Sequence, residues 1–220
     1  MNYTFHWNQA LRRLPEMLDG ALVTLQVASL AMLIGIVIAV FLAYGRLSDN
    51  RTARAVATGW VEIARNTPAL FQIYFFYFGL GSFGLRLDPF SALLAGIAFN
   101  NAGYLAETFR GGLQAIPPSQ TRAARSLGLS ALQTSVHVVL PQMFRIVFYP
   151  MTNQMVWSIL MSSLGVIVGM TSDLTGVTQE LNARTFRTFE FFALAAVLYY
   201  AMAKLTILAA RLIGWRLFRT

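Results

Sequence analysis

The chain has 220 residues, of which 56% are hydrophobic and only 12% are Asp, Glu, Lys or Arg. Soluble domains carry about 25% charged residues, so this composition argues against a soluble protein and indicates one embedded in lipid. The net charge of +8 would suit nucleic acid only if the basic residues gathered on one solvated face, but they lie between apolar runs. Because the chain has no cysteine, disulfides, thiolate metal sites and cysteine nucleophiles are excluded.

The apolar runs predict an all-α membrane protein with five transmembrane helices, since about 20 helical residues cross a hydrocarbon core of roughly 30 Å. Residues 1–19 place apolar and aromatic side chains at helical spacing, and they are expected to form a periplasmic interfacial helix, with a disordered arm as the alternative. A single transmembrane domain is expected over residues 20–215, followed by a cytoplasmic tail at 216–220. The predicted spans cover residues 20–45, 59–82, 89–108, 143–171 and 190–211.

The basic residues predict how these spans are oriented. One side of the spans collects Arg46, Arg51, Arg54, Arg65, Arg110, Arg122, Arg125, Arg145, Arg211, Arg216 and Arg219. The basic residues on the other side nearly all have acidic residues close by in the sequence. The positive-inside rule therefore places the N-terminus outside and the C-terminus in the cytoplasm.

The cytoplasmic loop after the third span, residues 111–141, is too long for a simple connection. After a pair of prolines, Ser119 is the expected N-cap of a short helix that should end at Gly128. A second helical stretch from Ser130 is expected to stop at Pro141. The pattern predicts two short helices on the cytoplasmic face.

Several motifs of the chain resemble those of permease subunits of ABC importers. Ala123-Ala124, Gly128 and Leu140-Pro141 have the spacing of the EAA loop of those subunits, although Arg122 stands where that loop has Glu. Two further segments are similar to the polar amino acid importers of the histidine, glutamine and glutamate type: Arg65-Asn66-Thr67-Pro68-Ala69-Leu70 and Tyr104-Leu105-Ala106-Glu107-Thr108-Phe109-Arg110-Gly111-Gly112. Those importers often carry Lys-Asp-Thr-Ser-Leu in the fourth span, where this chain has Leu160-Met161-Ser162-Ser163-Leu164.

The resemblance implies a type I ABC importer permease, with five transmembrane helices, the N-terminal interfacial helix and a cytoplasmic coupling helix. The coupling segment would dock on an ATPase through Arg122, Ala123, Ala124, Arg125, Ser126, Leu127, Gly128, Leu140 and Pro141. An ordinary amphipathic helix lying on the membrane surface is the alternative for this segment.

The resemblance also implies partners and a location. These are a second permease subunit, identical or different, two cytoplasmic ATP-binding cassette ATPases, and a periplasmic or extracellular amino acid binding protein, all at the inner membrane of a bacterium. ATP and Mg²⁺ would bind the ATPases, and this chain itself would hold neither cofactor nor metal. Transport would proceed by alternating access between two facing permeases.

Polar side chains inside the predicted spans are the candidates for a substrate path, because such groups are costly in lipid. The third span provides Asn100, Asn101, Tyr104 and Glu107, and the fourth provides Asn153, Gln154, Trp157, Ser158, Ser162 and Ser163. The competing interpretation is hydrogen bonding that only holds the helices together, with Gly96, Gly103, Gly165 and Gly169 allowing close packing. Because the Lys-Asp pair is missing, we hypothesise that a different partner permease supplies more of the substrate contact. The outer segment 171–190 is either a landing site for the binding protein or a solvated connector.

The sequence gives no reason to predict an enzyme. His6 and His137 are isolated, and no Gly-rich phosphate loop followed by Lys-Ser or Lys-Thr occurs. The predicted function is therefore ATP-driven import of polar amino acids, with energy from the partner ATPase. A passive channel, an assembly subunit of a membrane complex, and an ABC permease for another solute remain the alternatives.

Overall fold

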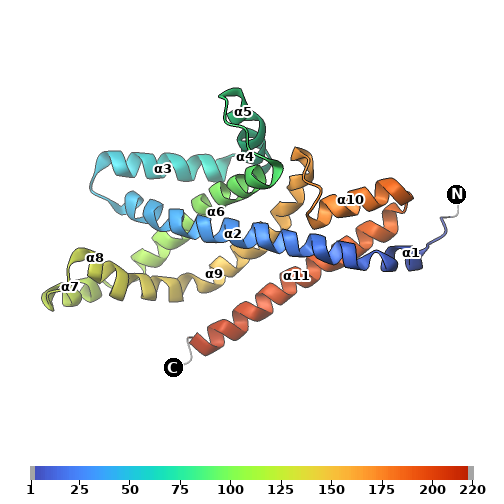
Figure 1. Ribbon diagram of the computed structural model, residues 1–220. Helices are drawn as coiled ribbons and strands as arrows, with labels where there is room; N and C mark the ends of the chain where they lie inside the picture. The colour runs from blue at the N-terminus through green and yellow to red at the C-terminus, as the bar shows by residue number, and fades with distance from the viewer. Residues whose placement is uncertain (1–2, 218–220) are drawn as a thin grey trace.

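The computed structural model describes residues 3–217, and all the regular structure in that range is helical, as the sequence predicts (Figure 1). The long helix α2, Leu14–Leu47, runs along the molecule after the short helix α1, Trp7–Arg12. Helix α2 begins at Leu14 rather than at residue 20, so part of the predicted interfacial segment belongs to the helix of the first span. Pro15 permits this early start because it lies in the first turn, where proline costs no hydrogen bond.

The N-terminal arm is packed against the start of the last helix. The ring of Tyr3 lies 5.0 Å from those of Phe5 and Phe189, and the backbone N–H of His6 donates to Glu190 Oε1 at 2.8 Å. Together with α1, these contacts favour an ordered segment over a disordered arm for residues 3–12.

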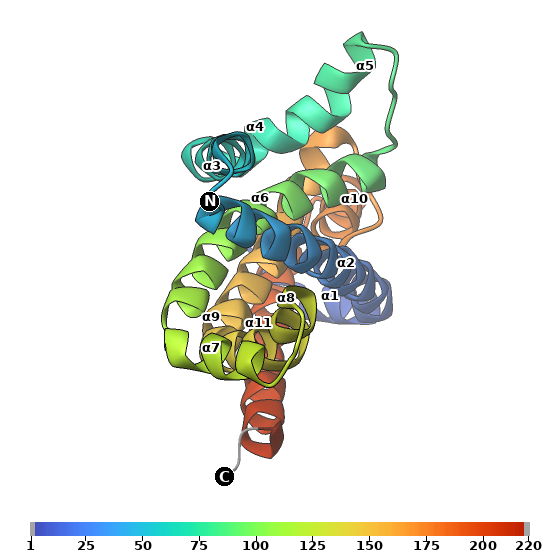
Figure 2. The ribbon, with the colours of Figure 1, turned by 90° about the vertical axis from the view of Figure 1, so that its left-hand side faces the viewer.

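The predicted second span, 59–82, is not one helix, and this expectation is corrected. Helix α3, Arg51–Asn66, ends before an extended Thr67, and the chain then turns into α4, Ala69–Tyr74. A π-helical turn, Phe75–Gly79, and the short α5, Leu80–Ser82, complete the segment. The physical cause is Pro68, because proline excludes the preceding residue from the helical region. Figure 2 shows α4 and α5 projecting from the rest of the molecule.

Helix α6, Pro89–Gln114, occupies the centre and packs against α2, α3, α4 and α9 (Figures 1 and 2). Pro89 opens it, as predicted, and Asp88 caps it by accepting from the backbone N–H groups of Phe90 and Ser91 at 3.0 and 3.1 Å. The Ser91 hydroxyl also donates to this carboxylate, and these bonds lower the pKa of Asp88. The cap fixes where α6 starts.

The predicted cytoplasmic loop folds as helix α7, Pro118–Ser126, followed by α8, Ala131–Thr134. Helix α7 ends at Ser126, and Gly128, with a φ of 87°, breaks the helix just after it, as predicted. Its N-terminus is corrected: Pro117 occupies the cap position and Pro118 the first turn, so Ser119 lies inside the helix.

The helix that follows does not stop at Pro141, which corrects a second boundary. A π-helical turn, Ser135–Val139, leads directly into α9, Leu140–Met161, with Pro141 in its first turn. The side chain of Gln142 donates to the Val138 carbonyl oxygen at 2.8 Å beside the proline. The wider turn and this side-chain bond accommodate a residue that lacks an N–H donor.

The last part of the chain is more helical than expected. A 3₁₀ turn, Ser162–Val168, ends at Gly169, and most of the predicted outer loop forms helix α10, Leu174–Thr185, capped by Asp173. Helix α11 covers Thr188–Leu217. Residues 218–220 of the predicted tail, including Arg219, lie outside the described residues.

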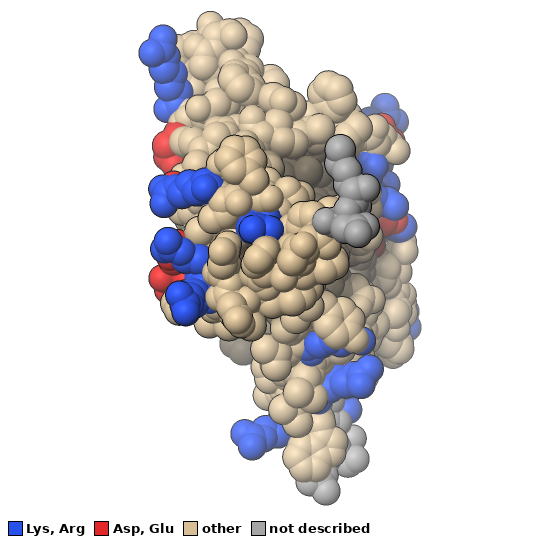
Figure 3. All heavy atoms as spheres, turned by 90° about the vertical axis from the view of Figure 1, so that its right-hand side faces the viewer, with Lys and Arg blue, Asp and Glu red and all other residues tan. Residues whose placement is uncertain are grey.

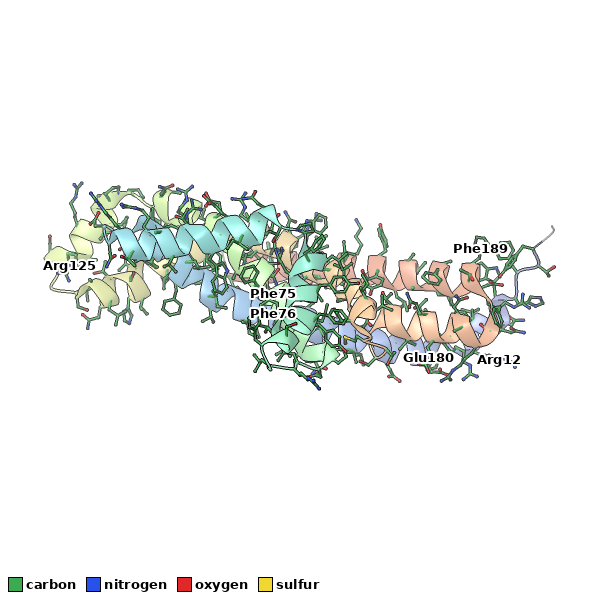
Figure 4. The ribbon with its side chains drawn as sticks, turned by 90° about the horizontal axis from the view of Figure 1, so that it is seen from above. Arg12, Phe75, Phe76, Arg125, Glu180 and Phe189 are labelled. Carbon is green, nitrogen blue, oxygen red and sulfur yellow. The ribbon has the colours of Figure 1, made fainter. Side chains whose placement is uncertain are left out.

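Within residues 3–217, the helical stretches long and apolar enough to cross a membrane are Leu14–Leu47, Ala131–Val168 and Thr188–Leu217. Figure 4 shows Arg125 at one end of the molecule, and Arg12, Glu180 and Phe189 at the other. Seen from the end that carries the N-terminus, charged side chains lie mostly around the rim (Figure 3). Helix α11 keeps large apolar residues exposed along its length, among them Val197, Leu205 and Leu212, as expected for a surface that faces lipid or a partner.

Candidate functional site

A hollow of about 510 Å³, lined by polar and apolar side chains, lies where α6, α9 and the break between α3 and α4 meet. It contains several of the predicted path residues: Asn100 and Tyr104 from α6, and Gln154 and Trp157 from α9. Its volume falls within the roughly 300–1,000 Å³ typical of small-molecule sites. We call it the first hollow.

The break between α3 and α4 lines the first hollow with Arg65, Asn66, Thr67, Pro68 and Ala69, none of which the sequence reasoning assigned to the path. The signal that could have found them is a proline inside a predicted span, directly after a polar run. A helix break exposes backbone groups, which only a protein interior or a water-filled cavity tolerates at membrane depth.

Gln72 holds this break in place, and the sequence reasoning missed it as well. Its Nε2 donates to the carbonyl oxygens of Ala64 and Thr67 at 2.9 and 3.1 Å. Asn100 Nδ2 donates to Gln72 Oε1 at 3.1 Å and so ties α6 to the same point. Gln72 and Asn100 are buried, so the geometry of the hollow is fixed by bonds protected from solvent.

Arg65 is the cation of the first hollow. Its guanidinium carbon lies 5.5 Å from the centre of the Tyr104 ring, and its side chain is exposed. Among the residues that the structure describes, no carboxylate lies within ion-pair distance of it. Arg65 therefore keeps its hydrogen-bond donors for another group.

A second group of predicted residues is packed between helices instead. Asn101 and Ser158 are fully buried, and Asn101 Nδ2 donates to Ser158 Oγ at 2.9 Å. Gln154 Nε2 donates to Asn101 Oδ1 at 2.9 Å, so this amide joins the buried cluster while Gln154 also borders the first hollow. The cluster connects α6 and α9.

The remaining fourth-span residues do not reach the first hollow. The hydroxyls of Ser162 and Ser163 donate back to the carbonyl oxygens of Ile159 and Leu160 in their own helix, at 2.8 and 2.7 Å. Asn153 is exposed and does not line this hollow. The structure thus brings together only part of the predicted path.

Glu107 lies further along α6 and belongs to a different polar cluster. Its carboxylate pairs with Arg46 of α2 and with Arg110 of its own helix, and Arg110 Nε donates to Glu107 Oε1 at 3.0 Å. Two guanidinium groups pair with Glu107, and that of Arg65 attracts it without an ion pair, so Glu107 is satisfied without a ligand.

Two of the glycines predicted to allow close packing do so on α6. A Cβ atom on Gly103 would lie 2.4 Å from Ala64 Cβ, and one on Gly96 would lie 2.6 Å from Ile73 Cγ1. Gly165 is similar, with Leu93 Cδ2 at 2.7 Å. Gly169 has open space around it and a φ of 82°, so its role is to end the 3₁₀ turn, which corrects the prediction.

The predicted coupling residues lie at one end of the molecule. Arg122, Ala123, Arg125, Ser126 and Leu127 are exposed, whereas Ala124 is buried against the structure. Leu127 is 84% exposed. Leu140 packs against the core formed by α2, α3, α6 and α9, and Pro141 is exposed. Helix α7 thus presents Leu127 and its exposed basic residues on the surface.

No three or more His, Asp or Glu side chains of residues 3–217 come together in a way that could hold a metal ion. The chemistry available in the first hollow is therefore hydrogen bonding, ion pairing with Arg65 and contact with the rings of Tyr104 and Trp157. These interactions can bind a polar solute, and they offer no nucleophile beside a base.

Known proteins with similar sequences match this chain over most of its length. The glutamine transport system permease protein GlnP of Escherichia coli (strain K12) is 34% identical over 197 residues, which is 89% of this chain and 90% of the relative. The probable glutamine ABC transporter permease protein GlnM of Bacillus subtilis (strain 168) is 33% identical over 186 residues, or 84% and 85% of the two chains.

Solved structures agree in fold. A chain of a crystal structure of an amino acid ABC transporter with histidines matches with a TM-score of 0.86 and 29% identity, covering 98% of this chain and all of the other. A chain of the MetNI methionine ABC transporter in an inward-facing conformation matches with a TM-score of 0.75 over 92% of this chain, and at 18% identity it supports the fold alone. Residues 31–219 match the family described as binding-protein-dependent transport system inner membrane component. The chain therefore belongs to this family and is a membrane permease subunit of an ABC transporter.

Proposed function

We propose that the chain imports polar amino acids and that the first hollow binds them during transport. The observation that carries this proposal is the Arg65 guanidinium, which lies beside amide groups without a carboxylate partner of its own among residues 3–217. An α-carboxylate matches a guanidinium in charge and in planar geometry. The glutamine and amino acid transport named for the relatives is consistent with such a substrate.

Other groups of the first hollow suit the rest of an amino acid. The side-chain amides of Asn66, Asn100 and Gln154 border the space. Trp157 is 61% exposed, and the face of its ring can attract an α-ammonium group. The chain lacks the Lys-Asp pair of the fourth span, and Arg65 supplies a cation in its place. This chain would then provide part of the substrate contact that we expected from a partner permease.

The rest of the transporter follows from the same proposal. The exposed rings of Tyr104 and Trp157 suggest that a second permease, identical or different, closes the hollow. With the five crossings that the sequence predicts, the N-terminus and α10 would lie outside, where the binding protein would dock. Helix α7 would then lie in the cytoplasm, where two ATPases would bind ATP and Mg²⁺. Alternating access would then open the first hollow to each side in turn.

Uptake into proteoliposomes tests this function. The complex of this chain with its permease partner, ATPases and binding protein should accumulate radiolabelled L-glutamine when ATP is present on the ATPase side. A variant ATPase that binds ATP without hydrolysing it should abolish the accumulation. Flux that continues without hydrolysis would support a passive channel, and ATP-driven uptake of a solute other than amino acids would support the other alternative.

Gly128 tests whether α7 transmits the ATPase movement. Gly128→Leu forces a branched side chain into a left-handed backbone conformation, whereas Gly128→Asn places there a residue that tolerates it. We expect the leucine variant to hydrolyse ATP without transport and the asparagine variant to transport normally. Normal uptake by the leucine variant would contradict a coupling role.

A further inference from the structure

A second polar hollow of about 300 Å³ adjoins the first, between α2, α3 and α6. Its lining consists of Arg46, Val61, Glu62, Arg65, Asn66, Tyr104 and Glu107, all of them polar except Val61. Arg65, Asn66 and Tyr104 also border the first hollow, so the two spaces share one wall. A solute held in the first hollow is therefore next to the second.

The charges around the second hollow are not all compensated. Glu107 is neutralised by Arg46 and by Arg110. Glu62 and Arg65 lie three residues apart on α3, a spacing at which opposite charges commonly pair, yet no ion pair joins them in the described part of the chain. The Arg65 guanidinium attracts Glu107 electrostatically without forming an ion pair with it. The Glu62 carboxylate and the Arg65 guanidinium therefore border the same small space without an ion pair.

This arrangement matches the charges of an amino acid backbone. We propose that the second hollow is a separate binding site for the transported zwitterion, with the α-carboxylate on Arg65 and the α-ammonium on Glu62. The proposal rests on the proposed function, because it assumes that the first hollow already binds an amino acid.

The shared wall gives a physical route between the two sites. Arg65 stacks on the Tyr104 ring at the boundary, so it can keep the α-carboxylate while the ammonium leaves Trp157 for Glu62. In the proposed orientation Glu107 lies nearer the cytoplasmic end of α6 than Asn100, so the second hollow is on the way out. Because only the α-ammonium moves in this step, the α-carboxylate stays paired with Arg65, and the substrate avoids the cost of an unpaired charge.

The test compares Glu62→Gln with Asp49→Asn in the complete transporter. Both changes remove one negative charge, but Asp49 lies in the exposed turn between α2 and α3 and lines neither hollow. The measurements are the maximal rate of ATP-driven uptake of radiolabelled L-glutamine and the glutamine concentration that gives half of that rate, in proteoliposomes. The thermal midpoint of each complex is measured alongside.

We expect Glu62→Gln to lower the maximal rate about tenfold, the value of one charged hydrogen bond. The half-maximal concentration should change less than about twofold, because capture in the first hollow is unaffected. Glu62→Asp should restore part of the rate, since a carboxylate is retained, and Asp49→Asn should behave as the wild type.

A Glu62→Gln rate equal to that of Asp49→Asn would overturn the second site. The second site would also be overturned if the maximal rate of Glu62→Gln fell only as far as its lowered thermal midpoint explains. A Glu62→Asp variant with the same low rate as Glu62→Gln would overturn it too. These outcomes leave the proposed function intact, because the wild type would still accumulate glutamine. Absence of ATP-driven uptake of every polar amino acid by the wild type, glutamine included, would overturn both proposals.

Discussion

Helix α6 carries polar residues on two sides that differ in how their hydrogen bonds are satisfied. On the packed side, Asn101 is fully buried and bonds Ser158 and Gln154 at 2.9 Å. On the open side, Tyr104 is 40% exposed, and the bond from its hydroxyl to the Arg65 carbonyl oxygen is long, at 3.5 Å. Polar groups that hold the bundle together are saturated, and those able to bind a solute are left available.

This difference in hydrogen bonding separates two interpretations of the polar residues that the sequence alone could not distinguish. Polar residues in a span can line a path or can bond helices, and both patterns repeat at helical spacing. Asn101 and Asn100 are adjacent in sequence, yet Asn101 bonds α9, while Asn100 bonds Gln72 at the edge of the first hollow. Each residue's role depends on what its partners leave unbonded.

Stability should be most sensitive to substitutions on the packed side of α6. Gly103→Leu would place a Cβ atom 2.4 Å from Ala64 Cβ, so α3 and α6 must separate. We expect the free energy of unfolding in detergent to fall by about 3 kcal/mol, the upper end for an overpacked site. Gly111→Leu is the matched control in the same helix, because no atom lies within 4 Å of its Cβ position. Equal stability of the two variants would contradict this account of the packing.

Asn101→Leu tests the bonds of the packed side. The leucine leaves Gln154 without a partner for its Nε2 group and removes the amide bonds to Ser158, so we expect a loss of about 2 kcal/mol in the free energy of unfolding. Glutamine binding should weaken little, since Asn101 does not line the first hollow. A large loss of binding at unchanged stability would move Asn101 to the open side.

The sequence predicts most of the helices because long apolar runs and caps are local features. Pro89 and Gly128 act within one turn of the chain, and the structure places both where the pattern expects them. The break at Pro68 is also a local signal, but its place inside an apolar run favoured an unbroken span. Pro141 shows the opposite error, because the π-helical turn before it lets the helix continue.

The candidate site was less predictable, since it depends on which residues from distant segments meet. Half of the first hollow comes from the α3–α4 break, and nothing in the spacing of α6 or α9 indicates that this break lies beside them. Gln72 is a single polar residue in an aromatic run, and its role arises from bonds to Ala64 and Thr67 across the break. Side-chain partners of this kind are tertiary information.

Gln72→Met tests a residue that belongs to both sides of this contrast. Gln72 is buried, like the residues on the packed side of α6, but its bonds support the open side. Removing its bonds to the carbonyl oxygens of Ala64 and Thr67 should cost about 1 kcal/mol of unfolding free energy. Uptake should also slow, since the break that lines the first hollow loses its support. A stability loss with fully normal uptake would show that the hollow does not depend on this residue.

Arg65→Gln has the smallest expected effect on stability and tests the open side of α6 most directly. Arg65 is exposed and makes no ion pair within residues 3–217, so the free energy of unfolding should change little. Uptake should require about tenfold more glutamine for half of its maximal rate, which corresponds to about 1.4 kcal/mol of lost binding. Arg51→Gln, at the exposed start of the same helix, removes the same charge away from both hollows and should leave uptake unchanged. Equal uptake by the Arg65→Gln and Arg51→Gln variants would show that the Arg65 guanidinium is only a surface charge. Another group in the first hollow would then have to bind the substrate carboxylate.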